Sequence, residues 1–284
     1  MDPLPDPVVV PLVYDDGVNI VIRKFRPEDA PQLHAMLIEG IIHGPDSPRN
    51  NAHRKSLTSR VAFISYIGFA LGLAACLYPT SVFPIRLAGA ASSLFSIALF
   101  VSLRRSITKL FIAFCAAARN GDMKDIDATY ASPGGFWVAA IEDKEGLHSE
   151  VVGYLGSDYN ATPSPTSAEL RRMIVSRHHR RRRIASLLIT AAVAHSARVR
   201  VPVQVNGGGS ESSKERSTLE LDTLDLETPS FHLGAQKLYR RHGFEIVGSR
   251  VMHAPAPRWL GKSLFEMTVV RLRRSGLGEG EMKA

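Results

Sequence analysis

Two adjacent runs of apolar residues in the first half of the chain constrain the fold most. Residues 61–78 read VAFISYIGFALGLAACLY and residues 87–103 read LAGAASSLFSIALFVSL, and neither run contains a charged residue. Each run is close to the lower limit of about 17–25 apolar residues that cross the hydrocarbon core of a bilayer. Because Pro79 interrupts the apolar pattern between them, the two runs predict a hairpin of two apolar helices.

Basic residues flank this apolar block on both sides. They are Arg54, Lys55 and Arg60 before it, and Arg104, Arg105 and Lys109 after it. Because basic residues favour the cytoplasmic side of a membrane, both ends of the hairpin are expected on that side. We therefore predict a transmembrane hairpin over residues 60–105. A re-entrant hairpin, which Arg86 near the turn would suit, and a buried helical pair in a soluble core remain alternatives.

Charge and cysteine content exclude several classes of protein. The formal net charge is +8, which favours acidic partners such as a phosphorylated cofactor, anionic lipid or nucleic acid. The only cysteines are Cys76 and Cys115, and no Cys-x-x-Cys or Cys/His metal spacing occurs. We therefore expect neither a disulfide framework nor a metal site. The acidic, proline-rich N-terminus lacks the basic and apolar regions of a signal peptide.

The rest of the sequence alternates between strand and helix patterns. Strands are expected over residues 18–25, 135–142, 151–154, 168–175, 199–205, 219–228, 244–251 and 262–272. Helices are expected over residues 27–44, 106–120, 180–195 and 230–242, with a short helical turn over residues 122–130. This order predicts an α/β (α+β) fold with a mixed, mostly antiparallel sheet and helices on both faces.

The same pattern predicts how the chain is divided. Residues 18–59 and 106–272 would form one domain that the apolar hairpin interrupts. Residues 1–17 and 273–284 are expected to be tails, and residues 45–59 a polar, basic loop. Residues 206–217 read NGGGSESSKERS, a composition typical of a flexible insert.

A strongly basic segment runs from a predicted strand into a predicted helix. Residues 170–188 read LRRMIVSRHHRRRRIASLL. The N-terminus of a helix presents free N–H groups and a positive dipole end that bind phosphate, and arginines add charge-assisted hydrogen bonds. The segment therefore fits a cofactor with a pyrophosphate. A solvated basic surface or a nuclear-localisation run is the alternative.

Within this segment, Arg180–Ala185 (RRRRIA) resembles the pyrophosphate loop of the GNAT superfamily of N-acetyltransferases, Arg/Gln-x-x-Gly-x-Gly/Ala. The first and last residues match, whereas Arg183 replaces the middle glycine, which lets a backbone approach phosphate closely. The resemblance implies the GNAT fold and acetyl-CoA as co-substrate. Its implied phosphate-binding residues are Arg180, Arg181, Arg182, Arg183, Ile184 and Ala185. The backbone of Met173, Ile174 and Val175 would bind the pantetheine arm where this strand splays from the next.

A second segment, Ala235–Phe244 (AQKLYRRHGF), resembles the helix that follows the fifth strand of the family. The resemblance implies that the Tyr239 hydroxyl protonates the departing thiolate and that His232 and Ala235 lie along the pantetheine. A core tyrosine with a hydrogen-bonded hydroxyl is the alternative for Tyr239. The attacking amine needs a base. Glu169 is the candidate base, with Asp225 and Glu227 on the next strand, although all three are also compatible with solvated surface acids.

A third resemblance narrows the family. Residues 121–130 (GDMKDIDATY) and 134–140 (GGFWVAA) resemble the camello-like, or microsomal, N-acetyltransferase branch, whose members carry an apolar hairpin before this segment. They acetylate cysteine S-conjugates, aspartate or lysine side chains. The resemblance implies an enzyme of the endoplasmic reticulum membrane whose catalytic domain faces the cytoplasm.

Two other functions remain possible on the sequence. The arginine at position 183 motivates a catalytically impaired membrane adaptor with a GNAT fold. Residues 177–183 would suit a nucleic-acid binder, but the chain lacks interleaved aromatic residues and a reading module, so no specific nucleic-acid partner is expected.

Overall fold

The structure is a computed structural model that describes residues 12–13, 19–142, 149–162, 164–204, 216–254 and 264–277. Most of the predicted N-terminal tail and of the predicted flexible insert lies outside these residues. Three segments correct those predictions, because Leu12–Val13, residues 216–217 and residues 273–274 belong to strands.

The sheet contains eight strands in the order β1-β2-β3-β4-β5-β8-β10-β9. Their bounds are β1 Leu12–Val13, β2 Asn19–Lys24, β3 Gly135–Glu142, β4 Ser149–Asp158, β5 Ser167–Val175, β8 Thr223–Pro229, β9 Glu245–His253 and β10 Glu266–Arg274. Every neighbouring pair is antiparallel except β5 and β8, which are parallel. The predicted mixed, mostly antiparallel sheet is therefore confirmed. A separate ribbon pairs β6 (Arg200–Gln204) with β7 (Arg216–Glu220).

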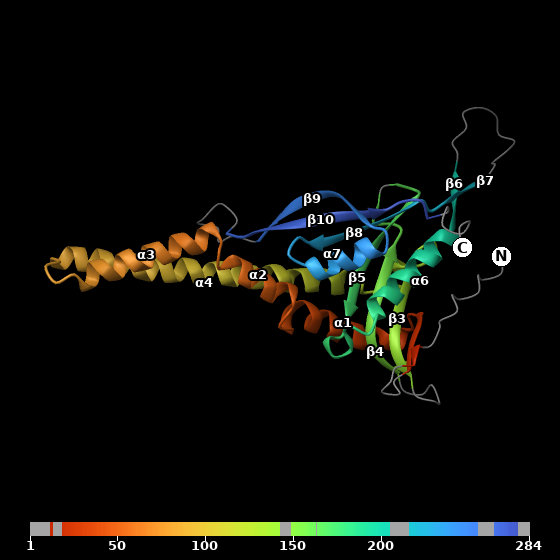
Figure 1. Cartoon of the computed structure of the whole chain (residues 1–284), viewed down its shortest axis with the longest axis horizontal. Helices are drawn as coiled ribbons and strands as arrows, with labels where there is room; N and C mark the ends of the chain where they lie inside the picture. The colour runs from red at the N-terminus through yellow and green to blue at the C-terminus, as the bar shows by residue number, and fades with distance from the viewer. Residues whose placement is uncertain are drawn as a thin grey trace, which may run out of the picture.

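Helices cover both faces of this sheet (Figure 1). Their bounds are α1 Ala30–Ile38, α2 Pro48–Ser56, α3 Arg60–Leu77, α4 Phe83–Asn120, α5 Ile126–Thr129, α6 Ile184–Arg198 and α7 Leu233–Arg241. Three further turns are helical: η1 Pro27–Asp29, η2 Glu39–His43 and η3 Arg177–His179.

The alternation of side chains along β3 shows how the two faces are filled. Trp137 and Ala139 belong to the core cluster that α6 and α7 complete, whereas Phe136, Val138 and Ala140 belong to the cluster formed with α1 and the C-terminal part of α4. Successive residues of a strand point to opposite faces, so an apolar strand such as β3 serves both cores.

Helices α3 and α4 form an antiparallel hairpin that projects away from the sheet (Figure 1). Glycines permit its close packing, since a Cβ atom on Gly72 would lie 2.5 Å from the carbonyl oxygen of Gly89. The Ser92 hydroxyl donates a hydrogen bond to the Gly68 carbonyl at 3.1 Å. Small residues thus let the two backbones approach, as in membrane helix pairs.

Helix α4 is continuous over 38 residues, so the predicted hairpin helix 87–103 continues through the predicted helix 106–120. Arg104 and Arg105 end the apolar run, but neither residue breaks a helix. Residues 45–59 are not a loop, because α2 lies within them. Its N-cap Ser47 accepts a hydrogen bond from the Asn50 N–H at 3.2 Å.

Other elements differ from their predicted bounds by a few residues. The predicted helix 180–195 begins only at Ile184, because Arg181 and Arg183 have positive φ angles of 65° and 54°. The predicted strand 219–228 is divided between β7 and β8, and the predicted strand 151–154 is the longer β4. The predicted helix 27–44 is a succession of η1, α1 and η2.

Candidate active site

The strands β5 and β8 separate in the middle of the sheet. They pair from Ser167 opposite Thr223 to Leu170 opposite Leu226, and beyond those residues the structure shows no pairing between them. β5 continues to Val175 beside β4, and β8 continues to Pro229 beside β10. The predicted splay next to Met173–Val175 is therefore present.

A β-bulge at Arg172 orients the opened part of β5. Between the pairs Gly156–Arg171 and Tyr154–Ile174, β5 has one residue more than β4. Arg172 is left-handed, with a φ angle of 58°. As a result, Met173 packs against the α6/α7 core and Ile174 against the α1/α4 core. A bulge changes the faces to which the following residues point.

Tyr239 of α7 lies at this opening. Its side chain is buried against the edge of Phe244, with the ring centroids 6.0 Å apart. Its hydroxyl points to Met173, whose sulfur lies 3.9 Å from the Tyr239 oxygen. Burial raises the pKa of Tyr239, so the hydroxyl keeps its proton at neutral pH and acts as a donor.

The loop before α6 contains residues in the left-handed conformation that glycine usually adopts, although it contains no glycine. Arg183 is the N-cap of α6 and takes the left-handed conformation, and its side chain is exposed. Arg181 is also left-handed, whereas Arg182 between them is not. When left-handed residues alternate with other residues in this way, successive N–H groups point into a concavity that can bind an anion. Here the concavity adjoins the N-terminus of the 15-residue helix α6.

The side chains of this loop differ in their exposure to solvent. Arg180, Arg181 and Arg183 are exposed, and Arg182 and Ala185 are half-buried. Ile184 instead is buried in the core, where a Cβ on Gly153 would lie 3.1 Å from its Cγ2 atom. Ile184 and Ala185 therefore offer backbone N–H groups to a phosphate, and the arginines offer side chains.

Two cations of the basic segment pair with acids near α1. Arg180 Nη1 lies 3.9 Å from Asp46 Oδ2, and Arg177 Nε lies 3.3 Å from Glu39 Oε1. Both ion pairs are exposed, so each contributes little to stability. The same region forms a groove between η2 and the end of β5, lined in part by Ile174. These acids could not be predicted from the sequence, because they lie more than 100 residues before their partners.

His232 lies on the same side of the opening as Tyr239. It is the N-cap residue of α7, and its Nε2 atom is buried with no hydrogen-bond partner among the described residues. Burial, followed by the charge of Arg180, lowers the pKa of His232, so the imidazole is neutral. Ala235, which lies about one turn further along α7, is half-buried against the α6/α7 core. The structure thus brings Tyr239 to Met173, and it places His232 at the start of the helix that carries Tyr239.

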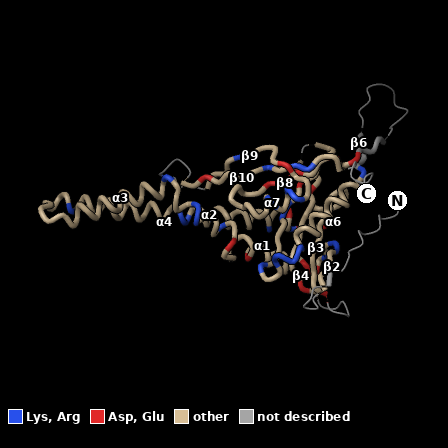
Figure 2. Tube along the Cα trace, viewed as in Figure 1, with Lys and Arg blue, Asp and Glu red and all other residues tan. Residues whose placement is uncertain are grey.

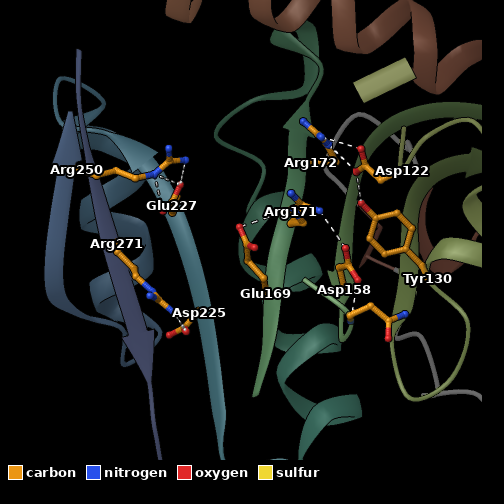
Figure 3. Close-up of polar contacts among 11 residues, drawn as sticks. Asp122, Tyr130, Asp158, Glu169, Arg171, Arg172, Asp225, Glu227, Arg250 and Arg271 are labelled. Carbon is orange, nitrogen blue, oxygen red and sulfur yellow. Dashed lines mark hydrogen bonds and ion pairs between the residues drawn. The ribbon is translucent and has the colours of Figure 1, made fainter. Parts of the chain in front are cut away.

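Glu169 is not brought to Tyr239. Its neighbours Ala168 and Leu170 face the α6/α7 core, so Glu169 points to the opposite face of the sheet, at the closed end of the splay. Burial raises the pKa of Glu169, the charges of Glu227 and Asp158 raise it further, and Arg171 opposes them. The Arg171 Nε atom lies 3.7 Å from Glu169 Oε1 (Figure 3).

Neighbouring carboxylates on that face are bound by arginines (Figure 3). Arg250 Nε donates to both oxygens of Glu227 at 2.9 and 3.0 Å. Asp225 is buried and accepts hydrogen bonds from Arg271 and from Arg273. Burial alone would raise the pKa of Asp225, but these arginines lower it. Glu169 is the acid of this group whose environment favours proton uptake, which suits a general base.

Residues 132–246 match the sequence profile of the acetyltransferase (GNAT) domain. The match includes the splayed strands, the loop before α6 and the helix α7. Over residues 132–246 the sequence is similar to the GNAT acetyltransferase domain. This similarity supports an acyltransferase, and the predicted mixed α/β fold is confirmed.

Several solved structures align with most of the chain at low identity. An acetyltransferase of the GNAT family from Staphylococcus aureus Mu50 is 13% identical, with 90% of this chain and 98% of that chain covered and a TM-score of 0.44. One from Streptococcus pneumoniae is 15% identical, with the same coverage and a TM-score of 0.41. Arabidopsis thaliana NAA60, solved with a bisubstrate analogue, is 11% identical over 90% and 99% of the chains, with a TM-score of 0.42. No curated protein matches the sequence.

One group of residues next to the splay was not predicted from the sequence. Arg172 forms a two-point ion pair with Asp122, which follows α4, and the Tyr130 hydroxyl donates to the same carboxylate. A signal was present, because Arg171 and Arg172 are consecutive charged residues that interrupt the alternation of β5. Two adjacent polar residues in an otherwise alternating strand are typical of a bulge.

Proposed function

We propose that this protein is a membrane-bound N-acetyltransferase that transfers the acetyl group of acetyl-CoA to a primary amine. The observation that carries the proposal is the opening between β5 and β8, which has the Tyr239 hydroxyl on one side and the N-terminus of α6 at its end. The residues present fit a thioester with a long amide-containing arm and a pyrophosphate.

Acetyl-CoA would bind along this opening. The amides of its pantetheine arm would pair with the backbone of Met173–Val175 in the manner of an added strand. Its pyrophosphate would bind the backbone N–H groups of Ile184 and Ala185 and the side chains of Arg180–Arg183. His232 would bond the arm between these two ends; its buried Nε2 atom, which has no hydrogen-bond partner among the described residues, supports this role.

The reaction would be a direct transfer. The nitrogen of a neutral amine attacks the thioester carbonyl carbon, which forms the C–N bond and places negative charge on the carbonyl oxygen. The C–S bond then breaks, and the thiolate takes the proton of the Tyr239 hydroxyl. The amine proton passes to Glu169 through water, because Glu169 lies on the opposite face and does not contact Tyr239.

The acceptor would approach from the Glu169 face. That face carries Glu169 and Glu227 as well as the exposed arginines Arg250 and Arg271. Resemblance to the camello-like branch supports an amino acid, a cysteine S-conjugate or a lysine side chain as the acceptor.

The membrane part of the proposal rests on the hairpin. Among the described residues, α3 and α4 are long and apolar enough to cross a bilayer. The 18 residues of α3 span about 27 Å, close to the hydrocarbon thickness of about 30 Å. Large apolar side chains such as Leu77 (71%) and Phe83 (78%) are exposed, which argues against a buried pair in a soluble core.

The distribution of charged residues supports an orientation in which both ends of the hairpin lie on the cytoplasmic side. No acidic residue occurs between Asp46 and Asp122, and none lies on α3 or α4 (Figure 2). Basic residues gather where α2, α3 and α4 meet: Arg49, Arg54, Lys55, Arg60, Arg104, Arg105 and Lys109. This distribution would hold the catalytic domain on the cytoplasmic side, with the endoplasmic reticulum proposed as the membrane.

Acetyl transfer to a panel of amines tests the proposal. Labelled acetyl-CoA would be incubated with the detergent-solubilised full chain and amino acids, cysteine conjugates or lysine peptides. We expect transfer to one class, and we expect Tyr239→Phe to lower kcat by about 100-fold without lowering the melting temperature. Absence of transfer to every amine, together with absence of thermal stabilisation by acetyl-CoA, would contradict the proposal.

A further inference from the structure

A buried cluster joins the end of α4 to the opened part of β5 (Figure 3). Arg172 Nε and Nη2 donate to the two oxygens of Asp122, both at 2.7 Å. The Tyr130 hydroxyl donates to Asp122 at 2.6 Å. Only 11% of the Arg172 side chain and 9% of the Asp122 side chain are exposed. Arg172 belongs to β5, whereas Asp122 lies in the turn after α4 and Tyr130 directly follows α5.

Aromatic rings complete the surroundings of this cluster. The Arg172 guanidinium lies 5.0 Å from the ring centroid of Phe114 on α4. The ring of Tyr130 packs against Phe136 and over Gly156, where a Cβ atom would lie 2.5 Å from the Tyr130 ring. Gly156 pairs with Arg171 at the bulge. The absence of a side chain at Gly156 therefore lets Tyr130 reach Asp122.

The cluster holds Arg172 in a conformation that residues with side chains avoid. Its φ angle of 58° is in the left-handed region, where a Cβ atom crowds the carbonyl oxygen. Such conformations persist when surrounding contacts determine them. The two hydrogen bonds to Asp122 and the contact with Phe114 supply those contacts.

The bulge at Arg172 decides where the next residues of β5 point. With regular alternation after Leu170, Met173 would face α1 and α4; with the bulge, it faces α7 and contacts the Tyr239 hydroxyl. Residues 173–175 are the segment to which the pantetheine arm would bind. The conformation of Arg172 and the geometry of that segment are therefore linked.

We propose that Asp122 and Arg172 are positioning residues for acetyl-CoA: their ion pair holds the bulge that aims Met173–Val175 at the pantetheine arm and at Tyr239. This inference rests on the proposed function, because it assigns a role within the same site. It also connects α4, the long helix of the hairpin, to the strand that would bind the co-substrate.

Two substitutions of Arg172 separate this role from a merely stabilising one. Arg172→Ala and Arg172→Gly both remove the ion pair, but only glycine accepts a positive φ angle freely. We expect Arg172→Ala to raise the KM for acetyl-CoA by about tenfold or more, and Arg172→Gly to raise it several-fold less. Equal effects of the two variants on KM would overturn the inference.

Asp122→Asn should also raise the KM for acetyl-CoA, because it leaves Arg172 buried without its charge partner. Asp29→Asn is the matched control, since Asp29 forms a buried two-point pair with Arg23 at 2.7 and 2.8 Å, away from the splay. We expect both variants to lower the melting temperature, whereas only Asp122→Asn changes KM.

The wild-type chain distinguishes the possible failures. If wild type binds acetyl-CoA in calorimetry and Asp122→Asn and Arg172→Ala bind equally well, the positioning role is wrong and the proposed function stands. If wild type itself does not bind acetyl-CoA, both are wrong.

Discussion

Arg183 stands where the pyrophosphate loop that this segment resembles has a glycine. Its backbone is left-handed although it carries a long side chain, which costs about 1–2 kcal/mol relative to a residue without a Cβ atom. The side chain is exposed, and the backbone has the conformation that a glycine adopts freely. We therefore expect the cost to fall on stability and not on the backbone geometry of the loop.

Replacement of Arg183 by glycine tests this explanation. Arg183→Gly should raise the free energy of unfolding by about 1 kcal/mol, because glycine adopts the same φ angle without crowding. The affinity for acetyl-CoA should stay within a few-fold of wild type in calorimetry. If only the glycine variant binds acetyl-CoA, the native protein is instead an impaired adaptor with a GNAT fold.

The pKa of Glu169 gives a prediction about pH. Burial raises this pKa, and a base must be deprotonated, so kcat/KM should rise with pH through the raised value and then level off. Glu169→Gln should lower kcat/KM and remove that rise. A pH–rate profile of the variant with the same acidic limb as wild type would exclude Glu169 as the base.

The same shift has a consequence for stability. The folded-state pKa of Glu169 lies above its unfolded value. The contribution of Glu169 to the free energy of unfolding is therefore present below the unfolded pKa and is lost as pH rises through the folded pKa. At neutral pH the charged side chain therefore opposes folding. Glu169→Gln should accordingly raise the melting temperature slightly at pH 7 and have less effect near pH 4.

Among the elements, the α3–α4 hairpin depends on close approach of two backbones. Gly72→Ala should destabilise it by about 1–3 kcal/mol, since the new Cβ atom would lie 2.5 Å from the Gly89 carbonyl oxygen and from Ser93 Oγ. Gly234→Ala in α7 is the control, because no atom lies within 4 Å of its added Cβ atom. Thermal unfolding should show a loss for the first variant and no loss for the second.

Sequence patterns predicted the elements that are uniformly apolar or that have a regular apolar period. The strands β3, β5 and β10, the apolar hairpin and Tyr239 on its helix were found because periodicity and the resemblance agree. Helix α2 was missed because it is polar and buries only Ala52 and Ser56, so no apolar period marks it. The continuation of the hairpin helix over residues 106–120 is confirmed by α4, because Arg104 and Arg105 change the hydropathy without breaking the helix.

Contacts between distant segments were beyond the reach of sequence patterns. Asp122 and Arg172 are 50 residues apart, and neither shows from the sequence that it will be buried. The opposite orientation of Glu169 and Tyr239 also depends on the sheet, because it follows from strand alternation and the packing of α7. The resemblance supplied the roles of these two residues but not the distance between them.

At the scale of the whole molecule, we propose a catalytic domain on a membrane hairpin. If α3 and α4 cross a bilayer, the full chain should stay in the membrane fraction after alkaline carbonate extraction, because their apolar surfaces would then be bound to lipid. With both hairpin ends on the cytoplasmic side, added protease should reach the catalytic domain in sealed microsomes. Release by carbonate would indicate a surface association, and protection from protease would reverse the orientation.

The central claim is that acetyl-CoA occupies the opening between β5 and β8 and the N-terminus of α6. Hydrogen–deuterium exchange of the full chain, with and without saturating acetyl-CoA, measures this directly. We predict slower exchange at the amides of residues 173–175 and 184–185 and unchanged exchange in β3, which lies elsewhere in the sheet. Unchanged exchange at both segments, or protection confined to other parts of the chain, would contradict the claim.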